Sequence, residues 1–266
     1  MKIGFLGDIV GKPGREIVRD TLPKARQDLG LDLVIANAEN AAHGFGFNQK
    51  VLEELMDCGI DIFTGGNHSF DNKAFWNLYD TFPIIRPANY AKSLPGKGMT
   101  TFKDLAIINL LGNFAMPICE NAFNVAQDLV EKLLKQGKRK IFIDFHAETT
   151  SEKMALMRML EGKISFIAGT HTHTGTDDLI IKDGTGFITD VGLNGCFDGV
   201  IGMAKKEPIE GFKTGVKFRL QIPKKCTKIF QLLVFELSKD GKCMSAQKHR
   251  KIGENPLEKI NKAVFL

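Results

Sequence analysis

Short apolar runs of strand length recur along the chain, and five of them are followed closely by a polar side chain suited to metal binding or proton transfer. Runs of this length and apolar character are typical of buried strands. The five predicted strands are Ile3–Leu6, Leu31–Ala36, Ile60–Phe63, Lys140–Phe145 and Lys163–Ala168.

Segments with helical periodicity separate several of these strands. Their apolar residues recur at spacings of three and four, and Asn48 and Gly59 stand at positions typical of a helix cap and a helix stop. Gly11–Gly14 is predicted to form a turn before the first helix. The predicted helices are Arg15–Leu29, Asn48–Cys58, one from Phe123 to near Gly137, and Ser151–Leu160.

Later in the chain, strand patterns follow one another without long helices between them, which favours antiparallel pairing. Combined with the early alternation of strands and helices, this predicts an α/β fold with two sheets between helical layers. No linker or low-complexity tract divides residues 1–266, so we expect a single domain. The further predicted strands are Lys103–Leu110, Gly186–Val191, Val216–Ile222 and Ile229–Phe235.

Composition narrows the class of protein. The chain has 266 residues, is 43% hydrophobic and can bury a substantial core. Its five cysteines include no CxxC pair, which argues against a zinc ribbon or a disulfide framework. The first apolar run is too short for a signal peptide and no 18-residue apolar stretch occurs, so we expect a cytoplasmic protein without a membrane segment.

The net charge of +5 comes from the C-terminal quarter, which contains the pairs Lys205–Lys206 and Lys224–Lys225. A basic surface attracts anionic substrates or RNA, but lysines of this kind also form ordinary solvated faces. Both interpretations stay open.

The polar residues that follow the strands form the candidate site. In an open α/β sheet, sites lie at the carboxyl ends of strands, so these residues are expected to converge. Their oxygen and imidazole donors suit iron, manganese, zinc or cobalt, and seven ligands are too many for one tetrahedral zinc. We therefore predict two ions sharing a carboxylate. The candidate ligands are Asp8, Glu39, Asn40, Asn67, His146, His171 and His173.

Such a centre favours phosphoryl hydrolysis. Two divalent ions, two carboxylates and a bridging hydroxide leave a net charge of about +1, which matches a phosphate diester. No GxSxG, P-loop or GxGxxG motif opens a helix after a strand, so other common catalytic arrangements lack support. The glycine-rich segment His43–Asn48 is interpreted either as a surface loop or as a substrate flap.

The order of these motifs resembles the calcineurin-like metallophosphoesterases, and from Met1 to about Gly202 the chain is similar to their bacterial YmdB-type branch. The resemblance implies a four-layer αββα sandwich and a dimetal phosphodiesterase acting on cyclic nucleotides, with 2',3'-cyclic AMP the usual substrate. The motifs that carry it are Gly7-Asp8, Glu39-Asn40, Gly66-Asn67-His68, His146, Gly169-Thr-His171-Thr-His173 and Thr189-Asp-Val-Gly-Leu-Asn-Gly195.

The resemblance also implies roles for individual residues. Asp8, Glu39, Asn40 and His173 would hold the first ion, and Glu39, Asn67, His146 and His171 the second. Glu39 would bridge the two ions, and His68 would give a proton to the leaving oxygen. Ile9-Val10 follow Asp8 where the superfamily has Asp-x-His, and Glu39 replaces a bridging Asp, so the first site is richer in oxygen. We expect iron, with manganese or zinc as alternatives.

Three functions remain open from the sequence. The first is a cyclic-nucleotide phosphodiesterase in which a metal-bridging hydroxide attacks phosphorus and His68 is the proton donor. The second is a phosphomonoesterase or phosphoprotein phosphatase on the same centre. The third is an RNA-binding regulator with a vestigial site, against which the complete ligand set argues. As partners we expect a cyclic nucleotide or another phosphodiester, including RNA-derived substrates, and a second copy of the chain in a homo-oligomer.

Overall fold

The computed structural model describes residues 1–266 and contains two seven-stranded β-sheets. In the first sheet the strand order is β13-β12-β11-β1-β2-β3, and β10 also pairs with β11. The pairs β1–β2 and β2–β3 are parallel, whereas β11, β12 and β13 are antiparallel to their neighbours. The strands are β1 (Lys2–Leu6), β2 (Leu33–Asn37), β3 (Ile62–Thr64), β10 (Gly195–Cys196), β11 (Lys228–Leu237), β12 (Cys243–Ile252) and β13 (Glu258–Lys262).

The second sheet has the order β14-β8-β9-β7-β6-β5-β4. Its centre is parallel from β5 through β6 and β7 to β9. Strand β4 is antiparallel to β5, and β8 is antiparallel to β9. The strands are β4 (Met99–Phe102), β5 (Leu105–Leu111), β6 (Lys140–His146), β7 (Phe166–Thr170), β8 (Ile180–Lys182), β9 (Thr185–Ile188) and β14 (Val264–Phe265).

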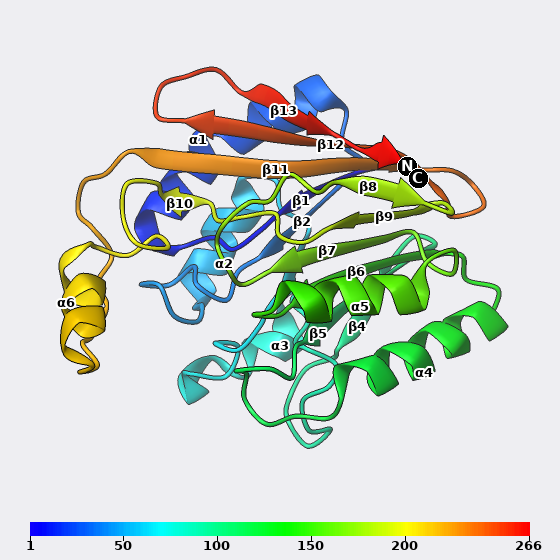
Figure 1. Ribbon diagram of the computed structural model, residues 1–266, viewed down its shortest axis with the longest axis horizontal. Helices are drawn as coiled ribbons and strands as arrows, with labels where there is room; N and C mark the ends of the chain where they lie inside the picture. The colour runs from blue at the N-terminus through cyan, green and yellow to red at the C-terminus, as the bar shows by residue number, and fades with distance from the viewer.

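Helices cover the outer faces of the two sheets, giving the four layers expected of an αββα sandwich (Figure 1). Apolar residues of α1 and α2 pack on the first sheet, and those of α4 and α5 pack on the second. No helix combines the length and apolar character needed to cross a membrane. The helices are α1 (Gly11–Leu29), α2 (Gln49–Asp57), η1 (Lys73–Phe75), α3 (Leu78–Thr81), α4 (Ala122–Lys135), α5 (Thr150–Leu160) and α6 (Lys206–Thr214).

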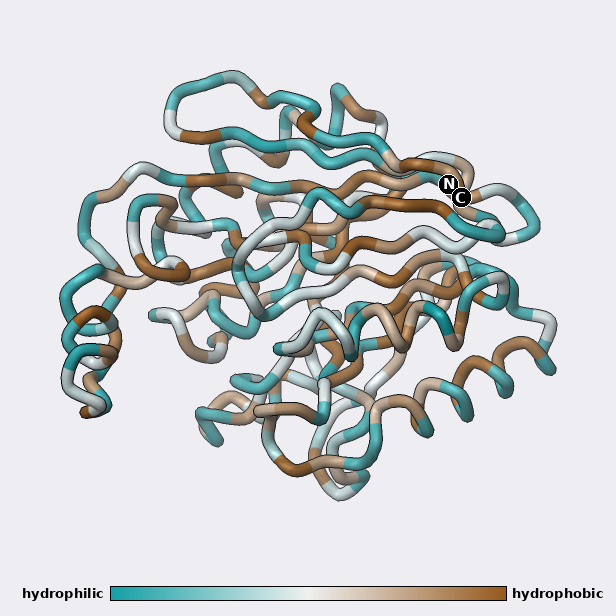
Figure 2. The backbone as a smooth tube through the Cα atoms, viewed as in Figure 1, coloured by the Kyte–Doolittle hydropathy of each residue, from teal (hydrophilic) through white to brown (hydrophobic).

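Alternate side chains along a strand point to opposite faces of its sheet, so they pack in different apolar layers. Phe5 of β1 faces the second sheet, while Leu6 packs beneath the helices. The ring of Phe142 in β6 lies 5.0 Å from that of Phe5, in the layer between the sheets. Asp144 and His146 follow Phe142 at two-residue spacing, so they face the same layer near its carboxyl end. Figure 2 shows the apolar strands enclosed by more polar outer segments.

The predicted turn Gly11–Gly14 is wrong, because these residues form the first turn of α1. Pro13 is compatible with that position, since the first helical turn needs no backbone N–H donor. The expected antiparallel pairing late in the chain is confirmed for β11, β12 and β13. The strand expected at Gly186–Val191 is the shorter β9, which pairs antiparallel with β8 but parallel with β7.

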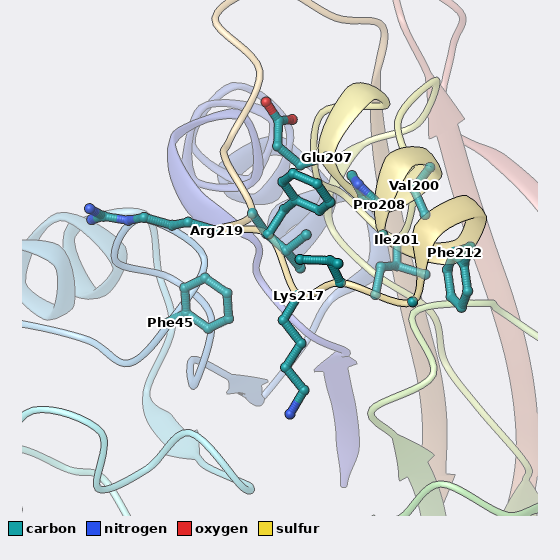
Figure 3. Close-up of a pocket in the computed structure, with 13 residues that line it drawn as sticks. Phe45, Val200, Ile201, Glu207, Pro208, Phe212, Lys217 and Arg219 are labelled. Atoms are coloured by element: carbon teal, nitrogen blue, oxygen red, sulfur yellow. The ribbon is translucent and has the colours of Figure 1, made fainter.

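The predicted strand Val216–Ile222 is also wrong, because this segment pairs with no strand. Leu220 and Ile222 pack on a small apolar cluster that contains Met203, so the alternating pattern is satisfied without a ladder. Val216 and its neighbours instead line an open pocket that also includes Phe45 (Figure 3). The helix α6 before this segment projects from one end of the molecule, and both termini lie at the other end (Figure 1).

Candidate metal centre

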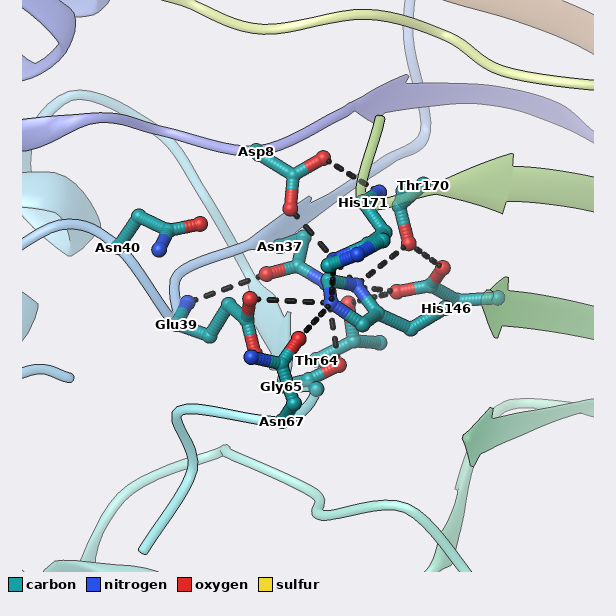
Figure 4. Close-up of polar contacts among 12 residues, drawn as sticks. Asp8, Asn37, Glu39, Asn40, Thr64, Gly65, Asn67, His146, Thr170 and His171 are labelled. Carbon is teal, nitrogen blue, oxygen red and sulfur yellow. Dashed lines mark hydrogen bonds and ion pairs between the residues drawn. The ribbon is translucent and has the colours of Figure 1, made fainter. Parts of the chain in front are cut away.

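The seven candidate ligands lie at the carboxyl ends of parallel strands from both sheets, as the sequence predicts, and Figure 4 labels all of them except His173. In the first sheet Asp8 follows β1, Glu39 and Asn40 follow β2, and Asn67 follows β3. In the second sheet His146 is the last residue of β6, and His171 and His173 follow β7. The site therefore spans the gap between the two sheets.

Four candidate ligands meet at Nε2 of His146. This nitrogen lies 2.9 Å from Oδ1 of Asn67, 3.0 Å from Oε1 of Glu39 and 3.1 Å from Nδ1 of His171. Nε2 of His171 also lies 2.8 Å from Oε2 of Glu148, a carboxylate that the sequence did not single out. The glutamate Glu39 and both histidines bring ligand atoms within 4.8 Å of one another.

Asp8 joins a second group of candidate ligands to the first. Its Oδ2 accepts a 3.0 Å hydrogen bond from the backbone N–H of His171. Its Oδ1 lies 3.7 Å from Nδ1 of His146 and 3.8 Å from Nε2 of His173. Nδ1 of His173 contacts the carbonyl oxygen of Ile201 at 2.8 Å, which leaves Nε2 facing Asp8.

Three candidate ligands each carry a buried oxygen atom with little or no hydrogen bonding. Oδ1 of Asp8 and Oδ1 of Asn40 have no hydrogen-bond partner, and Oε1 of Glu39 has only the 3.0 Å contact with Nε2 of His146. Asn40 makes none of the direct contacts described for the other ligands, but its amide nitrogen donates to the carbonyl of Gly44 at 2.9 Å and its oxygen points toward the cluster (Figure 4). Because buried polar atoms are normally paired, these oxygens fit cation ligands.

The buried residues Glu39 and His146 each stabilise the other's charged form, so this position favours positive charge. Burial opposes ionisation of Glu39, but the nearby His146 imidazole lowers the pKa of Glu39 to about 2. Burial likewise opposes charging of His146, yet Glu39 and Asp8 raise the pKa of His146 to about 9. Burial and the charge of His146 lower the pKa of His171 to about 4. A cation-binding role suits these residues.

A buried relay fixes the orientation of His146. Its Nδ1 lies 3.0 Å from the Thr170 hydroxyl, which donates to Asp144 at 2.7 Å. The carboxyl of Asp144 also accepts from Thr64 and, at 3.2 Å, from the amide of Asn37. Burial raises the pKa of Asp144 to about 7. In the neutral imidazole this relay favours a proton on Nδ1, facing Thr170, and an unprotonated Nε2, which is the form that binds a metal.

The sequence analysis missed Asp144, Thr170 and Asn37 as supporting residues. Asp144 and Asn37 lie inside buried strands, and a polar residue within an apolar run was the available signal. The face to which each side chain points depends on how the strands pair and how the two sheets pack, and the apolar sequence alone does not reveal this.

The double-histidine turn adopts an unusual backbone conformation. His171 and His173 have positive φ angles of 96° and 63°, which are uncommon for residues other than glycine. Asp190 holds the turn, because its Oδ2 accepts from the N–H and hydroxyl of Thr172 at 3.1 and 2.9 Å. Strain held in place by surrounding contacts is a feature of functional sites.

A buried ion pair in turn holds Asp190. Nζ of Lys153 lies 2.8 Å from Oδ2 of Asp190, and both side chains are fully buried. The same ammonium donates to the carbonyl of Thr170 at 2.8 Å. Lys153 belongs to α5, and the sequence indicated only that it is part of a helix. It connects the outer helical layer to the double-histidine turn.

His68 lies beside the ligand cluster rather than within it. Its backbone N–H donates to Oε2 of Glu39 at 2.9 Å, and its Nδ1 contacts Oδ2 of Asp71 at 2.7 Å. The ring packs edge-on against Phe45, with centroids 5.0 Å apart. About a quarter of the side chain is exposed, so Nε2 can reach a bound molecule.

Comparisons with known proteins agree with this architecture. A family model described as "YmdB-like protein" matches residues 5–249. A Bacillus subtilis (strain 168) protein named "2',3'-cyclic-nucleotide 2'-phosphodiesterase" is 42% identical over 228 residues, covering 84% of this chain and 86% of the relative.

Solved structures give the same result. A phosphatase from Mycoplasma pneumoniae superposes with a TM-score of 0.88 at 34% identity, covering 96% of this chain and 95% of that one. A hypothetical protein from Thermus thermophilus also has a TM-score of 0.88, at 31% identity, covering 95% of this chain and 100% of that one. The 5'-nucleotidase precursor of Thermus thermophilus shares only the fold, with a TM-score of 0.56 at 14% identity over 95% of this chain and 54% of that one.

Proposed function

The chain belongs to the YmdB-like family, and from that membership and the geometry of its site we propose that it is a metal-dependent phosphodiesterase acting on 2',3'-cyclic nucleotides such as 2',3'-cAMP. The observation that carries the proposal is the convergence of six strand-end side chains, with Asn40 aimed at them, around buried oxygens that lack hydrogen-bond partners. The name of the Bacillus subtilis relative supports the choice of substrate.

The metal ligands divide into two groups that share one carboxylate. Asp8, Glu39, Asn40 and His173 would hold the first ion, and Glu39, Asn67, His146 and His171 the second. The contacts around His146 support the second group, and the 3.8 Å approach of Asp8 to His173 supports the first. We propose iron, with manganese or zinc as alternatives. When bound, such ions lower the pKa of water and neutralise phosphoryl oxygens.

His68 is the proposed proton donor to the leaving oxygen. A ribose alkoxide is a poor leaving group, so its departure needs a proton in the transition state. Asp71 contacts Nδ1 of His68, which leaves Nε2 free to give the proton, and the backbone N–H of His68 holds the residue beside Glu39. The partial exposure of His68 gives the ring access both to substrate and to protons from solvent.

Charge favours a diester over a monoester. A diester carries one negative charge and matches a centre of about +1, whereas a monoester dianion resembles the product and would be held too firmly without further cations. Ring strain makes a 2',3'-cyclic phosphate the most reactive natural diester. The Mycoplasma pneumoniae protein is named a phosphatase, so phosphomonoester hydrolysis is the competing function.

Separation of reaction products over time distinguishes the two functions. The purified protein is incubated with 2',3'-cAMP, and with the resulting nucleoside monophosphate as a separate substrate. We expect the monophosphate to accumulate in proportion to the cyclic nucleotide consumed. The Asp8→Ala variant is the matched control for a contaminating phosphatase and should be inactive. Inorganic phosphate released as fast as 2',3'-cAMP disappears would favour the phosphatase instead.

A further inference from the structure

An apolar pocket lies beside the candidate metal centre and has no role in the chemistry described so far. Its volume is about 560 Å³, within the range of roughly 300–1,000 Å³ found for small-molecule sites. Its walls come from the loop around Phe45, the turn at Ile201, and α6 with the segment that follows it (Figure 3). The aromatic members of the lining are Phe45, Phe212 and Phe218.

Two pocket residues contact the candidate site directly. Phe45 packs its ring against the imidazole of His68, with centroids 5.0 Å apart. Ile201 receives the Nδ1 contact of His173 through its carbonyl oxygen at 2.8 Å. The pocket therefore begins beside the proposed proton donor and a proposed metal ligand.

The aromatic side chains of the pocket are more exposed than a structural role requires. Phe212 is 90% exposed and Phe218 is 44% exposed. Exposed apolar side chains grouped around a hollow indicate a binding surface. Phenylalanine rings also offer faces on which a planar heterocycle stacks.

We propose that this pocket binds the nucleobase of the substrate nucleotide. The inference rests on the proposed function. Because His68 gives a proton to the leaving ribose oxygen, the ribose must lie beside His68, and the base joined to that ribose extends toward Phe45. A second copy of the chain is a different occupant, but the direct contact of the lining with His68 and His173 favours a group belonging to the substrate.

Comparison of a nucleotide with a base-free analogue tests the pocket. The substrates are 2',3'-cAMP and the 2',3'-cyclic phosphate of methyl riboside, which has the same reacting group without a base. Phe218→Ala removes a stacking surface and Val216→Trp fills the pocket. Phe265→Ala, an exposed phenylalanine on β14 outside the pocket, is the matched control.

We expect both pocket variants to raise KM for 2',3'-cAMP by roughly 5- to 150-fold, the value of one aromatic stacking contact. The ratio of kcat/KM between 2',3'-cAMP and the base-free analogue should fall toward one. Phe265→Ala should keep the wild-type ratio. Circular dichroism confirms that the variants fold, and Val216→Trp changes a side chain that is 57% exposed.

Other outcomes would overturn the proposal in recognisable ways. An unchanged substrate ratio in both variants, or an equal loss on both substrates, means that the pocket does not bind the base. A variant with an unchanged kcat/KM ratio but a lower molecular mass in light scattering would show that the pocket surface forms a contact between copies of the chain instead. A wild-type protein that hydrolyses neither cyclic phosphate contradicts the proposed function itself, and the pocket proposal falls with it.

Discussion

The backbone N–H of His68 donates a 2.9 Å hydrogen bond to Oε2 of Glu39, so one turn holds both the proposed proton donor and the proposed bridging carboxylate. The contact uses the main chain of His68 and leaves its imidazole paired with Asp71. Removal of the His68 side chain therefore leaves the support of Glu39 in place. The two roles can be separated by experiment.

His68→Ala should retain metal yet lose activity on 2',3'-cAMP by about 10²–10⁴-fold, the usual contribution of general acid catalysis. The loss should shrink on a nitrophenyl phosphodiester, whose leaving group departs without a proton. Steady-state kinetics on both substrates, with elemental analysis of each protein, measures this. An equal loss on both substrates would remove His68 from the proton-donor role.

Gly66→Ala should disable the site, because no side chain fits at this position. An added Cβ would overlap Oε2 of Glu39 and Nε2 of His146. Displacement of a catalytic group by about 1 Å costs about 10²-fold in rate. Gly30→Ala, where a Cβ meets only open space but the backbone has a φ of 62°, is the control and should affect stability alone. Comparable kcat in the two variants would refute this account of Gly66.

Lys153→Met should lower the free energy of unfolding by about 3–5 kcal/mol, since it leaves the fully buried carboxylate of Asp190 without its cation. Arg158→Met on the same helix breaks an exposed pair with Glu161 and should cost only about 0–1 kcal/mol. Urea denaturation with a chelator present compares them without a contribution from metal binding. An equal loss of unfolding free energy in the two variants would contradict a special contribution from the buried Lys153–Asp190 pair.

Lys248 should make the free energy of unfolding rise with pH in the alkaline range. Burial lowers the pKa of Lys248 to about 8, below its ordinary value of about 10.4 in an unfolded chain. Between these values the unfolded chain holds a proton that the folded protein has lost, so stability gains with rising pH. Lys248→Met lacks this gain. Its unfolding free energy relative to wild type should be highest below pH 8 and decline by about pH 10, as urea titrations at about pH 7 and 9.5 can measure. A constant difference would contradict the lowered pKa.

The candidate ligands could be predicted because each one follows an apolar run, and such a run can be recognised from the local sequence. Asp8, Glu39 and His146 each stand where a buried strand meets a loop, and parallel strands bring such positions together. The two sheets between helical layers were predicted from the alternation of strands and helices. The four-layer αββα sandwich was predicted from the resemblance to a known family.

The supporting residues depend on contacts between segments far apart in the chain. The pairing of Lys153 with Asp190 joins α5 to the loop after β9, and no local pattern predicts it. β12 was missed because its residues are largely polar, including Lys248. Val216–Ile222 alternates like a strand, but its apolar residues pack on a side cluster and line the pocket instead.

The central claim is a pair of metal ions that share Glu39. Elemental analysis of the purified wild-type, Glu39→Ala and Asn40→Ala proteins measures the number of ions per chain. We expect about two transition-metal ions in the wild type, and a larger loss in Glu39→Ala than in Asn40→Ala, because a bridging carboxylate serves both ions and an amide serves one. Full metal occupancy in Glu39→Ala, equal to that of the wild type, would contradict the account.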